Sequence, residues 1–95
     1  MLLDTIQNRI NETANYITKQ EQAARISRTA LDTLSRDVDM IWDRCEEIID
    51  KSERCGWRYH LSVAERLHNE ATDLAKRLGA LYLKRQAVYL KQQAA

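Results

Sequence analysis

Apolar side chains recur every three or four residues along most of the chain, the spacing that places them on one face of an α-helix. In the first half, two columns with a seven-residue period describe this face. One column consists of Leu3, Ile10, Ile17, Ala24, Leu31, Val38, Cys45 and Ser52. The other consists of Ile6, Thr13, Gln20, Ser27, Leu34, Ile41, Ile48 and Cys55. The pattern predicts a long first helix, over about 4–54, with both columns facing a neighbouring helix.

The second column becomes polar between Thr13 and Ser27, and a polar group is costly to bury unless it is hydrogen-bonded. One interpretation is a continuous helix whose first part extends beyond its neighbour. The alternative is a break near Lys19–Gln22, after which a shorter helix folds back to make a three-helix bundle. Because neither glycine nor proline marks a break there, we favour the continuous helix.

The segment Cys55–His60 separates two helical patterns and contains Gly56, one of only two glycines in a chain without proline. Gly56 is well placed to adopt the left-handed backbone conformation that commonly ends a helix. Trp57 and Tyr59 follow it directly, and large aromatic side chains near a core are usually buried. We expect these two rings to fold over the end of the helices, and the alternative is an exposed aromatic tip that recognises a partner.

The second helix is predicted over about 62–93, after a turn at 55–61. Ser62-Val63-Ala64-Glu65 has the residue types of a capping box at its start. Gly79 lies inside this helix and suggests a close approach of backbones or a local bend. The predicted apolar face consists of Ala64, Leu67, Ala71, Leu74, Leu78, Leu81 and Val88, flanked by Ala75, Tyr82 and Tyr89. The chain, 1–95, is thus predicted to be one all-α domain, a coiled-coil-like antiparallel helical hairpin.

The two predicted helices differ in length, so the start of the first has no neighbour from its own chain. The end of the second is apolar on more than one face, and such a helix needs more than one neighbour. We predict that these two regions contact another protein or a second copy of the chain. A homodimer paired into a four-helix bundle is the simplest closed arrangement. The residues of this predicted surface are Leu3, Ile6, Ile10, Ile17, Tyr82, Leu83, Tyr89 and Leu90.

Charge changes this picture only locally. The chain has 15 basic and 14 acidic residues, a net charge of +1, which argues against a strongly steered binder of nucleic acid or membranes. The end of the second helix is nevertheless basic and interleaved with tyrosines, a pattern compatible with phosphate contacts. An alternative function is therefore a dimeric nucleic-acid-binding protein. Its phosphate contacts would come from Lys76, Arg77, Lys84, Arg85 and Lys91.

Residues for chemistry are sparse. Cys55 and His60 are the only nearby pair of a nucleophile and a base, and a helical hairpin offers no evident pocket around them. Together with Cys45 and His68 they lack the two-to-four-residue spacing that is typical of ligand pairs in structural zinc sites. We predict no catalysis, no metal and no cofactor.

The start of the chain, Met1-Leu2-Leu3-Asp4, has neither the basic residues nor the apolar core of a signal peptide. No apolar run approaches the ~20 residues of a membrane-spanning helix. We therefore expect a cytoplasmic protein with two reduced cysteines. The predicted function is that of a non-catalytic protein–protein interaction module, such as a small adaptor, a chaperone-like factor or an inhibitor.

Overall fold

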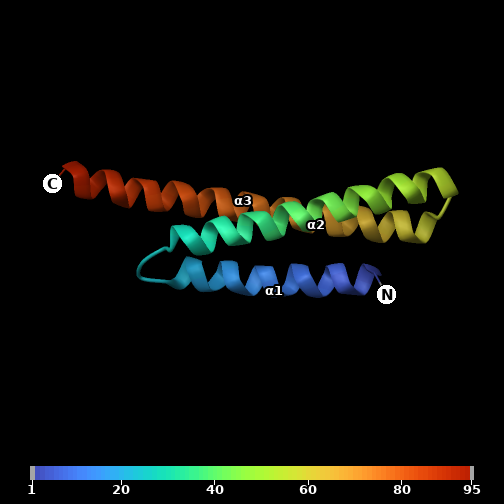
Figure 1. Cartoon of the computed structure of the whole chain (residues 1–95), viewed down its shortest axis with the longest axis horizontal. Coiled ribbons are helices and arrows are strands. Elements are labelled where there is room, and N and C mark those ends of the chain that lie inside the picture. The colour runs from blue at the N-terminus through green and yellow to red at the C-terminus, as the bar shows by residue number, and fades with distance from the viewer. Residues whose placement is uncertain (1, 95) are drawn as a thin grey trace.

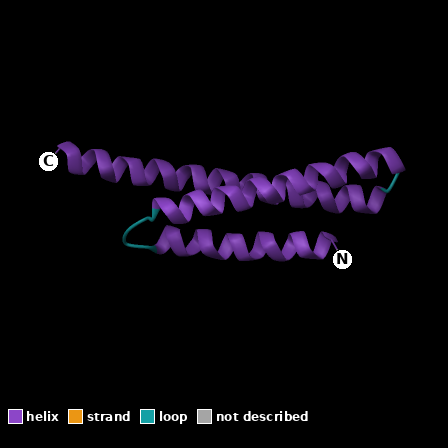
Figure 2. Ribbon diagram, viewed as in Figure 1, coloured by secondary structure: helices purple, strands orange, loops and turns teal. Residues whose placement is uncertain are grey.

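The structure, a computed structural model, describes residues 2–94, and this part of the chain forms three α-helices and no strand. Helix α1 spans Leu2–Gln22, α2 spans Arg28–Cys55 and α3 spans Arg58–Ala94. α2 runs antiparallel to α1, and α3 then runs back along both (Figure 1). Every pair of helices is in contact, in a molecule of 59 × 19 × 16 Å. Two short connections join the helices (Figure 2).

One apolar core lies between the three helices. Its side chains come from the positions with helical spacing, so the predicted apolar faces are confirmed for most of the chain. From α1 and α2 the buried apolar residues are Leu3, Ile6, Ile10, Ile17, Leu31, Leu34, Val38, Ile41 and Cys45. From α3 they are Ala64, Leu67, Ala71, Leu74, Leu78 and Leu81. Val88, the last predicted member of the α3 face, is exposed instead.

The favoured prediction of a continuous first helix is wrong. The chain leaves the helix at residues 23–27, which we call the α1–α2 loop, and α1 folds back onto the other two helices. The alternative prediction, a break near Lys19–Gln22 in a three-helix bundle, is consistent with this structure. A continuous helix would have left the four apolar residues of α1 in water, whereas folding back buries them, and burial stabilises each by about 1.5–3 kcal/mol.

The break between α1 and α2 contains neither glycine nor proline, and it is stabilised by hydrogen bonds of polar side chains. Ser27 is the N-cap residue of α2, and its Oγ accepts a hydrogen bond from the amide of Ala30 at 3.2 Å. The backbone amide of Ser27 in turn donates to Oε1 of Gln20 at 3.1 Å. Both residues belong to the column that turned polar. Their side chains thus satisfy backbone groups at the break rather than facing a helix.

The connection between α2 and α3 is shorter than predicted. Gly56 has φ 71° and ends α2 in the left-handed conformation, as expected, and the amide of Trp57 donates to the carbonyl of Ser52 at 2.9 Å. The carbonyl of Trp57 already accepts a hydrogen bond from the amide of Leu61 at 2.9 Å. The predicted start of the second helix at Ser62 is therefore wrong, because the backbone of Trp57 begins α3 without a capping side chain.

The two glycines are expected to respond to alanine with opposite signs. A Cβ atom at either position would meet nothing within 4 Å, so neither glycine is required by close packing and the predicted close approach at Gly79 is wrong. Gly56→Ala should lower the free energy of unfolding by about 1–2 kcal/mol, because its φ is positive. Gly79→Ala should raise it by roughly 0.5–1 kcal/mol, because alanine favours a helix interior. Urea denaturation of both variants measures this, and equal signs would contradict the assignment of Gly56 as the left-handed cap.

Helix α3 is much longer than the helices it packs against. It has 37 residues, or about 56 Å of helix, whereas α1 has 21 residues, or about 32 Å. Its last turns extend past the α1–α2 loop to the C-terminus (Figure 1). We call residues 83–93 of α3 the C-terminal segment.

Candidate protein-binding site

The N-terminal half of the predicted partner surface is not a surface. Leu3, Ile6, Ile10 and Ile17 are buried, and Ile17 has no exposed area at all. They face α2 and α3 of the same chain, because α1 folds back at the α1–α2 loop. The prediction that these four residues contact another chain is therefore wrong. The error arose because the break between α1 and α2 was not predicted.

The C-terminal half of that surface has two different fates. Tyr82 packs against the core, and its hydroxyl donates to Oδ1 of Asp32 at 2.6 Å and lies 3.3 Å from Oγ of Ser35. Burial, and secondly the bond to Asp32, raises the pKa of Tyr82. Tyr82 thus holds α3 against α2 and is only partly exposed.

The other large apolar side chains of the C-terminal segment are exposed. Leu83 is 68% exposed, Val88 51%, Tyr89 55% and Leu90 57%. Leu83 and Leu90 are seven residues apart and share one face of the helix, whereas Val88 lies about 140° away from Leu83 at about 100° per residue. The segment is therefore apolar on two sides, neither of which is covered by its own chain.

The reason that these side chains lack a neighbour is the register between α2 and α3. Tyr82 lies opposite Asp32 in the first turns of α2, and Nε of Arg85 donates to the carbonyl of Ile26, at 3.3 Å, in the α1–α2 loop. One turn further along α3, Val88 has passed the first residue of α2. Val88 was predicted as a core residue, and this prediction is wrong because the facing helix has ended.

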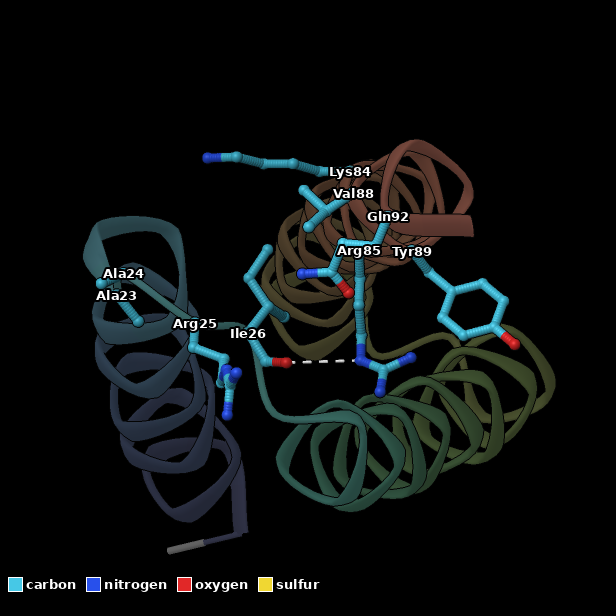
Figure 3. A pocket seen from close by; sticks show the side chains of 9 residues that line it. All are labelled: Ala23, Ala24, Arg25, Ile26, Lys84, Arg85, Val88, Tyr89 and Gln92. Atoms are coloured by element: carbon cyan, nitrogen blue, oxygen red, sulfur yellow. Dashed lines mark hydrogen bonds between the residues drawn. The ribbon is translucent and has the colours of Figure 1, made fainter. Parts of the chain in front are cut away.

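A groove of about 440 Å³ lies where the C-terminal segment passes the α1–α2 loop. Residues 23–26 of the loop form one wall, and α3 forms the other (Figure 3). The α3 wall consists of Lys84, Arg85, Val88, Tyr89 and Gln92. The heptad pattern did not indicate the loop side of the groove, where Ile26 is half-buried. Ile26 and Leu31 stand on either side of the Ser27 cap in the positions of a hydrophobic staple, a signal that could have located it.

Two of the five predicted phosphate-contacting residues make contacts within the chain. Nε of Arg77 donates to Oε2 of Glu21 at 3.2 Å, and Nη2 of Arg77 donates to Oγ1 of Thr18 at 3.0 Å. This pairing lowers the pKa of Glu21, mainly through the hydrogen bond from Arg77. Arg85 is bonded to the loop, as described above. Lys76, Lys84 and Lys91 are exposed.

A second, smaller hollow lies at the opposite end of the molecule, where Trp57 and His60 meet Leu2 and Leu3 of α1. Tyr59 does not fold over the helices as predicted, because α3 already starts at Arg58 and carries it outward, whereas Trp57 lies beside Leu2 and Leu3 and is 46% exposed. Both rings are exposed and contact the imidazole of His60, at centroid distances of 5.5 and 5.8 Å.

The candidate residues for chemistry are not brought together. Cys45 is buried, and burial raises the pKa of its thiol to about 11, so it is a poor nucleophile. His68 packs on Trp42 with ring centroids 4.6 Å apart, and its Nε2 lies 3.6 Å from Oε1 of Glu46. Within residues 2–94, no cluster of three or more His, Cys, Asp or Glu side chains is arranged to hold a metal ion.

No helix in residues 2–94 is both long enough and apolar enough to cross a membrane. Comparisons with protein-family models, curated proteins and solved structures give no match to this chain. The features of this structure that point to a function are the exposed apolar side chains of the C-terminal segment and the groove beside it.

Proposed function

We propose that this protein is a non-catalytic protein-binding module that offers the C-terminal segment of α3 to another protein. The observation that supports this most strongly is the exposure of four large apolar side chains on a helix end that its own chain does not cover. In this role the protein is an adaptor, a chaperone-like factor or an inhibitor. We place it in the cytoplasm, since both of its cysteines are free.

The spacing of the exposed residues supports recognition by a helix face. Leu83 and Leu90 lie two turns apart on one side, which is the spacing of anchors that enter an apolar groove of a partner. Burying one leucine side chain completely is worth about 1.5–3 kcal/mol. Two or three such anchors supply enough free energy for a specific complex, because a few central residues carry most of the affinity of an interface.

Three ligands are compared for the C-terminal segment: a second copy of the chain, nucleic acid and a protein of another sequence. Pairing with a second copy in a four-helix bundle would cover the Leu83–Leu90 face, although α1 already occupies one side of the bundle. The alternative, nucleic-acid binding, has less support because Arg77 and Arg85 make contacts within the chain. A protein of another sequence is the partner that we favour.

Affinity capture with the tagged protein from the cells of its source, with and without nuclease, tests the proposal. We expect a specific protein to be retained after nuclease treatment, since the contact is made by apolar side chains. Loss of all captured material with nuclease would show that nucleic acid, and not protein, is the ligand. Steep weakening of oligonucleotide binding between 50 and about 200 mM salt would support that second outcome.

A further inference from the structure

We infer that the groove between the α1–α2 loop and the C-terminal segment binds an acidic amphipathic helix of the partner protein. This inference rests on the proposed function and names the chemistry of the segment that is recognised. Three features support the acidic helix as the occupant: the shape of the groove, the charges at its rim and the helical backbone of its walls.

The groove has an apolar floor at a place where a helix is missing. Ile26 and Val88 supply its apolar surface on the side of α1, and the ring of Tyr89 lies on the other side of Arg85 (Figure 3). It lies just beyond the first residue of α2, between α3 and the loop that follows α1 (Figure 3). A helix placed there would pack on α3 beside the loop and bury Val88, the member of the apolar face that the chain itself leaves exposed.

The charged side chains that line the groove are all basic, and the neighbouring acidic side chain, Glu21, is paired with Arg77 and interacts electrostatically with Lys84. Arg25, Lys84 and Arg85 belong to its lining, which contains no acidic residue. After Asp73 the sequence has basic residues and no acidic ones, so Lys91 adds to the same field. Figure 3 shows the side chain of Lys84 extending from α3 on the side of α1, whereas that of Arg85 extends toward the loop. An occupant with carboxylates on both sides of an apolar stripe would meet a cation on either side of the floor.

The backbone favours a helix as the occupant. The walls are helix α3 and a loop next to two helices, and residues 2–94 form no strand that an extended peptide could join. An extended peptide would bury amide and carbonyl groups without partners, which costs free energy. A helix satisfies its own backbone groups and presents only side chains.

Two other occupants, a second C-terminal segment and nucleic acid, fit the groove less well than an acidic amphipathic helix. A second C-terminal segment would bring Lys84, Arg85 and Lys91 of two copies together, and like charges in contact are repelled. Nucleic acid carries the required negative charge but has no apolar side chain for Val88 and Ile26. Arg85 can serve an acidic partner while bonded to Ile26, because a guanidinium carries five N–H donors.

The test uses two fluorescein-labelled peptides of about 18 residues, or five helical turns. Both carry leucine along one face, with glutamate elsewhere in one and lysine in the other. Fluorescence anisotropy should show that the glutamate peptide binds the full chain at least about tenfold more tightly than the lysine peptide. Val88→Asp and Lys84→Glu should each weaken the glutamate peptide by about tenfold or more. Lys76→Glu, which makes the same charge change on α3 outside the groove, should leave binding unchanged.

Four results would overturn the inference. Equal binding of the two peptides, or no binding of either, would show that the groove does not select an acidic helix. Competition by a single-stranded oligonucleotide, lost in Lys84→Glu, would assign the groove to nucleic acid. A dimer in light scattering that becomes a monomer in Val88→Asp would assign it to a second copy.

Failure of this inference is distinguishable from failure of the proposed function. If affinity capture retains a protein through Leu83 and Leu90 while the glutamate peptide does not bind, the binding module stands and the acidic helix is wrong. Circular dichroism of the Val88→Asp and Lys84→Glu variants confirms that they are folded, as expected for substitutions at exposed positions.

Discussion

Replacing Ile17 by alanine is expected to lower the free energy of unfolding by about 2–5 kcal/mol. Ile17 is completely buried between α1 and the rest of the core, so alanine would remove buried carbon atoms and leave a cavity. A domain of this size is typically stable by about 5–14 kcal/mol, at roughly 0.05–0.15 kcal/mol per residue. The loss is therefore a large share of the total, and a urea titration followed by circular dichroism would measure it.

Tyr16→Ala is the matched control, because it removes a larger side chain from the neighbouring position of the same helix. Tyr16 is exposed, and its ring lies 5.2 Å from Nζ of Lys19, so the loss should stay below about 1 kcal/mol. If Ile17→Ala were as mild as Tyr16→Ala, α1 would not be packed on α2 and α3. The continuous first helix would then describe the protein better.

Replacing both Leu83 and Leu90 by aspartate is expected to weaken binding of the captured partner by at least about 100-fold. Each substitution removes an apolar anchor and places a carboxylate where the partner's apolar surface has to be desolvated. The unfolding midpoint should change little, since both side chains are more than half exposed in the free protein. Surface plasmon resonance with the purified partner measures the affinity, and circular dichroism the fold.

Met40→Asp combined with Tyr59→Asp is the control for this double variant. It adds the same two negative charges at exposed apolar residues, one on α2 and one at the start of α3, away from the C-terminal segment. Partner binding should be retained. An equal loss in both double variants would show that net charge, and not the exposed segment, governs the interaction.

Much of the core could be predicted from the sequence because helical spacing does not depend on the path of the chain. Ile6, Ile10 and Ile17 lie on the apolar face of α1 whether that helix continues or turns back. What the pattern leaves open is which helix they face. In the polar column the break was marked by Gln20 and Ser27, whose side chains accept hydrogen bonds from backbone amides at the start of α2. A polar residue in an apolar column fits an exposed helix equally well.

The candidate site was predictable in part for the same reason. Leu83 and Leu90 fall outside the apolar stripe of α3, so their exposure follows from the spacing alone. Val88 falls on the stripe, and its exposure depends on where α2 begins. That boundary is set by the Ser27 cap, sixty-one positions away along the sequence, and by the pairing of Tyr82 with Asp32. Contacts between distant parts of the chain are not contained in a local pattern.

Helix α3 continues without a break from the three-helix bundle into the C-terminal segment. This continuity affects how tightly the segment can bind a partner. Starting a helix in water is unfavourable, and isolated helices shorter than about 12–15 residues are marginal. The C-terminal segment does not have to start a new helix. It continues the turns of α3 in which Leu78 and Leu81 are buried in the core. Its anchors are presented in a pre-organised helix, which lowers the entropy lost on association. Losing the core would remove that template, so the affinity for a partner is coupled to the stability of helices that the partner never touches.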